Sequence, residues 1–126
     1  IPDGAYDYAI LGETLQTVRK PRFVLREMLR VARTGIVSFP NFGKLSHRVR
    51  LCASGRMPKG GALPFEWYDT PNIHLFTLND FVDICRADGI TIARMVCISD
   101  CALARLLVSL GLRNLGADRV LVQITR

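Results

Sequence analysis

The side chains best suited to chemistry gather in one irregular stretch, residues 65–76 (FEWYDTPNIHLF). Aromatic rings with polar tips suit a lid or a binding surface, and loops often carry function. A histidine here could act as a general base, because the ordinary pKa of imidazole is ~6.5. The candidates are Trp67, Tyr68, Asp69, Thr70, Asn72 and His74. The alternative is a purely structural role for the segment. The rings would pack on a sheet edge, and the histidine would be non-catalytic, because no acidic residue is spaced to orient its imidazole.

A second set of polar side chains follows two short strands expected at residues 6–11 and 35–39. In an open α/β sheet, ligands bind beyond the carboxyl ends of the strands. The candidates there are Glu13, Thr14 and Gln16 after the first strand, and Asn41 and Phe42 after the second. Ordinary turn chemistry explains the same residues equally simply, since an asparagine commonly satisfies the backbone of its own turn.

Several other chemistries are excluded by spacing. Ser38 lacks the GxSxG elbow of a serine hydrolase. The cysteines and histidines show none of the paired spacings of a zinc site, so we expect no metal. Three of the cysteines lie in apolar periodic segments, which favours free buried thiols in a reducing cytoplasm. The four cysteines are Cys52, Cys85, Cys97 and Cys101.

The charge balance is basic. Among 126 residues, 17 Lys and Arg against 11 Asp and Glu give a net charge of +6. The densest patch is Lys44, His47, Arg48, Arg50, Arg56 and Lys59. Because it lacks the interleaved aromatic residues that stack on bases, it favours a solvated helix face or a docking face for an acidic partner over a nucleic-acid site. No apolar run approaches the ~20 residues of a membrane span.

The elements that must position the candidates form a strand, helix, strand unit. Residues 6–11 are apolar on both faces, which is typical of a buried parallel strand. Pro21 opens a helix with an apolar stripe at Leu25, Met28, Leu29 and Ala32. Gly35 is expected to stop this helix. Residues 35–39 then form the second strand, which implies a parallel pair with a right-handed crossover.

The remaining pattern predicts two more strands. A basic helix at 45–52 has Leu45, Val49 and Cys52 on one side, and a loop rich in Gly and Pro covers 54–64. Thr77 and Asp80 predict a capping box, flanked by a hydrophobic staple of Phe76 and Phe81, for a helix that ends at Gly89. Strands are expected at 90–98 and 120–124, with a short helix or ordered excursion at 102–110.

Some parts of a nucleotide-binding α/β fold are not in this sequence. There is no GxGxxG and no GxxxxGK[ST] turn. The first residue is Ile1, and the chain opens directly on a strand that should have neighbours on both sides. The expectation is a piece of a longer protein.

Four segments closely resemble the methionine biosynthesis protein MetW family: DYAILGETLQTV, PRFVLREMLRVARTGIVSFPNFG, GRMP and LPFEWYDTPNIHLFTLNDF. The resemblance implies an α/β fold, a partial Rossmann-like (class I methyltransferase-like) three-layer sandwich. Residues 1–126 would be the C-terminal part of a single domain, carrying strands four to seven in the order 4-5-7-6, with the last strand antiparallel. The N-terminal half that binds S-adenosylmethionine would be absent.

The resemblance also implies a function. It predicts a bacterial, cytoplasmic protein of methionine biosynthesis that acts with homoserine O-acetyltransferase. The alternative is a genuine S-adenosylmethionine-dependent methyltransferase with an unknown small-molecule acceptor. S-adenosylmethionine is expected in the full-length parent, where Leu11 and Gly12 would contribute to its site, and not in this chain alone, which we expect to be inactive. Glu13, Thr14 and Gln16 would face the methyl group and its acceptor.

Overall fold

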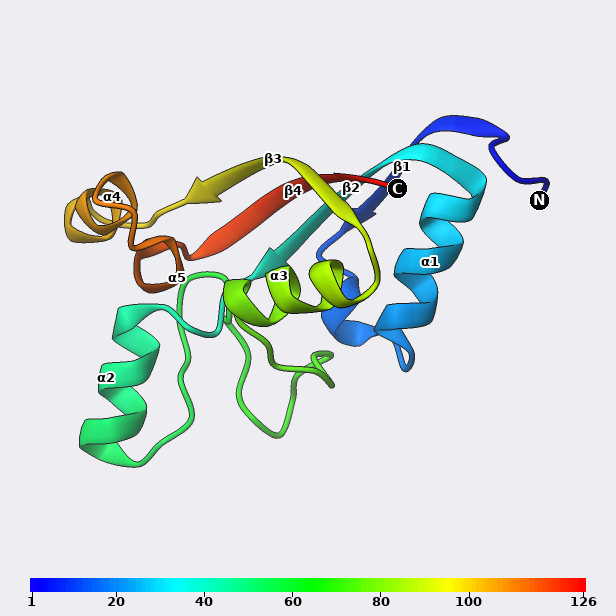
Figure 1. The fold of residues 1–126 in the computed structure, drawn as a ribbon. Coiled ribbons are helices and arrows are strands. Elements are labelled where there is room, and N and C mark those ends of the chain that lie inside the picture. The colour runs from blue at the N-terminus through cyan, green and yellow to red at the C-terminus, as the bar shows by residue number, and fades with distance from the viewer.

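A four-stranded mixed sheet is the centre of the molecule (Figure 1). The structure is a computed structural model that describes residues 1–126. Its strands are β1 (Tyr6–Gly12), β2 (Ala32–Pro40), β3 (Thr91–Ile98) and β4 (Arg119–Thr125), in the order β1-β2-β4-β3. β1 and β2 are parallel, and β4 lies antiparallel to both of its neighbours. This is the order 4-5-7-6 that the resemblance implied.

The helices are η1 (Leu15–Thr17), α1 (Pro21–Val31), α2 (Leu45–Ser54), α3 (Leu78–Ala87), α4 (Ala102–Ser109) and α5 (Arg113–Gly116). α1 and α3 form the layer that covers one face of this sheet, α2, α4 and α5 lie toward one end of it, and the single turn η1 follows β1 (Figure 1). The sequence pattern did not predict η1 or α5, because a single turn is too short to show periodicity. None of the helices is long and apolar enough to cross a membrane.

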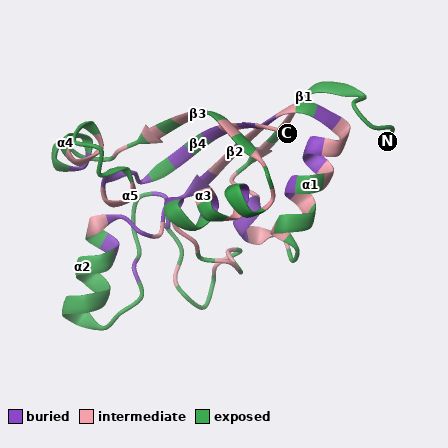
Figure 2. Ribbon diagram, in the orientation of Figure 1, coloured by how far each residue is buried: buried purple, intermediate pink, exposed green.

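No helix covers the opposite face of the sheet (Figures 1 and 2). Tyr8, Ile10, Val96, Ile98 and Leu121 are exposed there, Ile10 to 74%. The prediction that residues 6–11 are buried on both faces is therefore wrong. β1 is an edge strand, and nothing in the chain covers its free side or its second face. The α/β class and the partial Rossmann-like fold are confirmed, with two of the three expected layers present.

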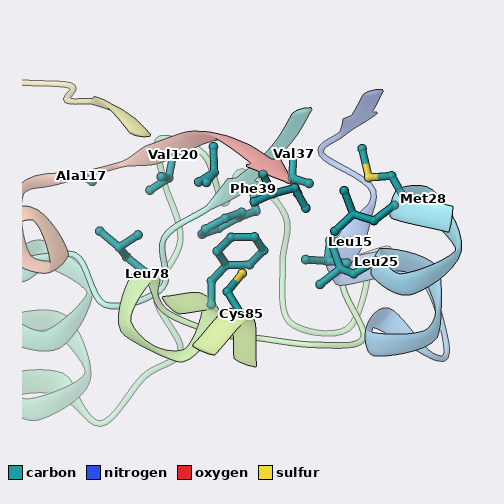
Figure 3. Close-up of a cluster of buried hydrophobic side chains, with 13 residues drawn as sticks. Leu15, Leu25, Met28, Val37, Phe39, Leu78, Cys85, Ala117 and Val120 are labelled. Carbon is teal, nitrogen blue, oxygen red and sulfur yellow. The ribbon is translucent and has the colours of Figure 1, made fainter. Parts of the chain in front are cut away.

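The core lies between the sheet and the layer of α1 and α3 (Figure 3). Val37 and Phe39 point into it from β2, and Val120, Val122 and Ile124 do so from β4; all five are fully buried. The ring of Phe39 packs against Phe76 and Phe81, with centroids 4.9 and 4.7 Å apart. The predicted staple pair therefore meets through a third ring from the sheet.

Gly35 does not stop the first helix. α1 ends at Val31 and β2 begins at Ala32, so Gly35 lies inside the strand. A Cβ on Gly35 would lie 2.9 Å from Cγ1 of Ile124 and 3.1 Å from Cε of Met28. The glycine is needed because α1 packs closely on the sheet at this point.

The third helix starts as predicted. The Thr77 hydroxyl accepts from the Asp80 backbone N–H at 3.3 Å, and the Asp80 carboxylate accepts from the Thr77 N–H at 2.9 Å. This capping box is confirmed, and Gly89 follows the helix with φ +68°.

The second helix differs from its prediction. Its buried residue is His47, whereas Val49 and Cys52, expected on an apolar side, are exposed.

Candidate functional site

Three segments far apart in the sequence meet beyond the carboxyl ends of β1 and β2. The backbone N–H groups of Ile73 and His74 donate to the Gln16 carbonyl at 2.9 and 3.0 Å. The N–H of Phe42 donates to the Phe76 carbonyl at 3.2 Å. The fold therefore places the candidate residues that follow β1 and β2 next to the loop of residues 65–76. In open α/β sheets, ligands bind at this carboxyl edge.

The turn after β1 is fixed by its own side chains. Glu13 has φ +51°, a conformation that residues other than glycine adopt rarely and that is enriched at functional sites. Its N–H donates to the carbonyl and hydroxyl oxygens of Ser38 at 3.0 and 3.1 Å. Its carboxylate lies 2.7 Å from Nε of Arg119. The Thr14 hydroxyl donates to the Gly12 carbonyl at 2.7 Å.

Gln16 is buried at the junction of this turn and the loop. Its Nε2 donates to the Glu13 carbonyl at 2.8 Å, while its Oε1 has no partner within the protein. A buried amide oxygen without a donor costs free energy unless something supplies one. Of the three candidates after β1, Gln16 therefore has a polar atom free to accept a hydrogen bond from a ligand.

Asn41 serves its own turn. Its side chain is fully buried. Nδ2 donates to the carbonyls of Asn114 and Ala117, both at 2.9 Å, and Oδ1 accepts from the N–H groups of Gly43 and Leu78 at 3.2 and 3.0 Å. With these four bonds the amide joins the end of β2 to α3 and α5, so it has no hydrogen-bonding capacity left for a substrate.

The loop presents aromatic surface and does not pack on the sheet as a small core. Trp67 and Tyr68 are 74% and 71% exposed, and their rings meet edge to face at 5.5 Å. Behind them is a small pocket of about 140 Å³, lined by residues of the loop, of the preceding glycine-rich segment and of the turn after β2. Its lining includes Phe42, Trp67, Thr70 and Asn72, whereas Asp69 is exposed outside it.

His74 lies in a different pocket, of about 360 Å³, between α1, the loop and α3. Its Nε2 is buried without a partner. Asp80 lines the same pocket, but its carboxylate caps α3 through Thr77. The structure therefore shows no histidine–carboxylate pair of the kind that general base catalysis uses.

A buried charge cluster that sequence reasoning missed lies next to this edge. Nζ of Lys44 contacts Asp100 and lies 2.9 Å from Oδ1 of Asp118. Burial alone would lower the pKa of Lys44, but these two carboxylates outweigh it and raise that pKa. His47 is buried beside them, and both its burial and the charge of Lys44 lower its pKa. Two residues of the basic patch are thus internal and not solvated.

Local spacing could not reveal this cluster. Lys44 and His47 fit the pattern of a basic surface helix, and the carboxylate partners of Lys44 are 56 and 74 residues away. Asp118 Oδ1 also accepts from the Ala62 N–H at 3.3 Å. The cluster therefore ties the start of α2 and the glycine-rich segment to the start of β4.

All four cysteines are free, but only Cys85 is buried. Cys52 and Cys101 are exposed, and Cys97 is half-buried. Burial raises the pKa of Cys85 to about 11, so its thiol is protonated at neutral pH. No group of three or more His, Cys, Asp or Glu side chains is placed to hold a metal ion.

The strand order of the sheet is that of the class I methyltransferase fold. The S-adenosylmethionine dependent methyltransferase from Mesorhizobium loti superposes with a TM-score of 0.61 at 14% identity, over 100% of this chain and 64% of that one. The [4+2]-cyclase SpnF gives 0.59 at 15% identity, over 100% and 52%. At these identities the likeness shows the fold alone.

The chain belongs to the MetW family. The family described as "Methionine biosynthesis protein MetW" matches residues 1–124. A curated relative, the "Bifunctional methionine biosynthesis protein MetXA/MetW" of Rhodopirellula baltica, is 43% identical over 83 residues, which is 65% of this chain. The chain spans only 13% of that relative's length.

Proposed function

We propose that this chain is the C-terminal part of a methyltransferase-like domain that serves methionine biosynthesis together with homoserine O-acetyltransferase. The observation that carries the proposal is the match of the MetW family to residues 1–124. The relative named MetXA/MetW supports the partnership, because a single protein there combines two methionine biosynthesis functions.

The uncovered sheet supports the proposal that a preceding half belongs to the same domain. A long, apolar edge strand is usually avoided because it invites pairing with another strand, yet β1 exposes Tyr8 and Ile10. The Mesorhizobium loti structure contains more than a third of its chain beyond the region matched here. We propose that further strands pair with β1 and that helices of the preceding half cover the bare face.

The residues present fit only one edge of an S-adenosylmethionine site. Leu11 and Gly12 end β1 at the correct side of the sheet, and Gly12 leaves open space, since a Cβ there would meet only Ser38 Oγ, 4.0 Å away. The Glu13 carboxylate is paired with Arg119, and no glycine-rich strand-to-helix turn is present to cradle the cofactor. We therefore predict that cofactor binding requires the preceding half.

The carboxyl edge is the proposed ligand side. Trp67 and Tyr68 offer exposed aromatic surface, the kind of side chain that anchors protein and small-molecule partners. Phe42 and Asn72 line the pocket behind them, and Oε1 of Gln16 is a free buried acceptor. These side chains can position a ligand but are not arranged to transfer a proton. Such a site fits a docking subunit, and it also fits methyl transfer, because that reaction needs mainly correct placement of the two reactants.

Capture of homoserine O-acetyltransferase tests the partnership. The immobilised protein is expected to retain the acetyltransferase, and Trp67→Ala should reduce capture by about tenfold if the ring is an anchor of the interface. Phe23→Ala is the matched control, since this exposed ring lies on α1 and does not line the pocket of the loop. Full capture by the Trp67→Ala protein would rule out the loop as the anchor, and no capture by the unchanged protein would rule out the partnership.

Calorimetry separates the alternative, a genuine methyltransferase. A protein that joins the preceding half to this chain is titrated with S-adenosylmethionine. Saturable heat supports the proposed cofactor, and its absence argues against methyl transfer in favour of a purely non-catalytic role. Gln16→Ala then reports on the acceptor side: cofactor binding should persist while turnover of an acceptor falls.

A further inference from the structure

An apolar groove of about 400 Å³ lies between α2 and α4. Leu45 and Val49 form one wall, Leu103 and Leu107 the other, and Leu115 lines it from α5. Val49 and Leu103 are 56% and 57% exposed. The groove shares no lining residue with either pocket of the carboxyl edge, although Lys44 and Asp100 of the charge cluster line one end of its wall. The two pockets therefore do not account for its apolar walls.

The unpaired charges around this groove are positive. Asp100 also lines the groove, but its carboxylate is paired with Lys44. Residues 44–65 include five Lys and Arg but no Asp or Glu. Lys44 and Lys59 are neutralised by contacts with carboxylates. Arg50, which lines the groove, and Arg105 on α4 are exposed and take part in none of the ion pairs of the structure. One unpaired guanidinium group, that of Arg50, therefore lines the groove, and a second, that of Arg105, lies on the wall helix α4 outside the lining.

We propose that this groove binds an acidic amphipathic helix of a partner protein. A helix with apolar side chains at i, i+3, i+4 and i+7 can insert them between two walls of leucine and valine, as in other helix-in-groove complexes. Acidic residues beside that stripe would meet Arg50 and Arg105, which would fix orientation and speed association. The inference does not rest on the function proposed above, since it requires only the groove and its charge.

Charge argues against a second copy of this chain as the occupant. A symmetric contact places the same patch of both copies together, so the arginines of α2 and α4 would face their equivalents. Like charges at a desolvated contact are costly. An acidic helix removes the repulsion and pairs the same groups.

The test uses two labelled synthetic helical peptides with the same leucine stripe, one flanked by Glu and one by Lys, and measures fluorescence anisotropy against the full chain. The Glu peptide is expected to bind and the Lys peptide is not. Val49→Asp and Leu103→Asp should each weaken binding by about tenfold or more. Phe23→Asp, which makes the same type of change on exposed α1, should leave it unchanged.

Charge reversal makes the test sharper. Arg50→Glu together with Arg105→Glu should move the preference to the Lys peptide, with an unchanged circular dichroism spectrum confirming the fold. Equal binding of both peptides, no binding of either, or equal loss in Phe23→Asp would overturn the proposal. A dimer that sedimentation velocity detects and that Val49→Asp dissociates would also overturn it, because a second copy would then occupy the groove. The same holds if the Glu peptide does not bind while the protein binds vesicles of phosphatidylglycerol and phosphatidylcholine and the groove variants abolish that binding.

Discussion

At the scale of single residues, a carboxylate links the two helices that cover the sheet. Asp88, which ends α3, accepts from Nε of Arg22 at 2.8 Å and from Nη2 of Arg26 at 2.9 Å. The side chain of Asp88 is only 1% exposed, while both arginines of α1 are more than half exposed. The contacts with Arg22 and then Arg26 lower the pKa of Asp88 to about 2.

This pKa shift predicts how stability responds to acid. The ordinary pKa of Asp is ~3.9, and the folded value is lower, so the stabilisation is complete above the unfolded pKa and is lost as the pH falls toward about 2. Asp88→Asn should lower the melting temperature at neutral pH and remove this part of the acid dependence. Thermal melts across the pH range check it, with exposed Asp83→Asn as control. An unchanged pH profile in Asp88→Asn would contradict the assignment.

A residue's role could be predicted when its hydrogen-bonding or ion-pair partner lies close to it in the sequence. Thr77 and Asp80 are three residues apart, and their spacing alone predicted the capping box. Three of the four hydrogen bonds of the Asn41 amide, and the pairing of Lys44 with Asp118, involve groups 37 to 76 residues away. No local pattern records such contacts, so the sequence left the role of Asn41 open and did not reveal the charge cluster.

At the scale of elements, the packing of α3 on β2 depends on one ring. Phe39 is fully buried between Phe76 and Phe81. Phe39→Ala should destabilise the protein by about 3–5 kcal/mol, the usual cost of removing a buried ring. Phe23→Ala changes an exposed ring and should cost less than about 0.5 kcal/mol. Denaturant titrations compare them, and similar costs for the two variants would show that the ring of Phe39 is not central to the core.

The approach of α1 to the sheet gives a second element-scale prediction. Gly35→Ala places a methyl group against Ile124 and Met28, and overpacking of this kind typically costs about 1–3 kcal/mol. Gly12→Ala is the matched strand glycine, since its nearest neighbour would be Ser38 Oγ at 4.0 Å. It should be neutral or slightly stabilising. If both alanines behave alike in denaturant titrations, close packing does not explain Gly35.

Strong periodicity predicted the existence of most elements, and burial was harder to predict. The stripes of α1 and α3 and the apolar runs of β1, β2 and β4 indicated the correct structure types. The apolar run of β1 indicated a strand suited to an interior position, but a sequence pattern does not say whether the covering layer is present. The prediction of an apolar buried side for α2 was wrong because the contacts of that helix are not visible in its own sequence. Its buried residue is the polar His47, which packs beside charged side chains.

At the scale of the whole molecule, helices cover only one face of the sheet. α1 and α3 bury β2 and β4 from one face, while Tyr8, Ile10, Leu121 and Val96 remain exposed on the other (Figure 2). Family membership is shown over nearly the whole chain. The proposed preceding half would explain why a strand of interior composition lies at an edge, and it would supply the cofactor groups that this chain does not contain.

Hydrogen exchange at β1 tests this central proposal most directly. Outward-facing backbone N–H groups of an edge strand lack partners and exchange quickly, whereas paired ones are protected. We predict fast exchange across part of Tyr6–Gly12 in this chain, and strong protection of the same peptide in a protein that includes the preceding half. Exchange that is equally fast in both proteins would contradict the account, because β1 would then be a true edge of the sheet.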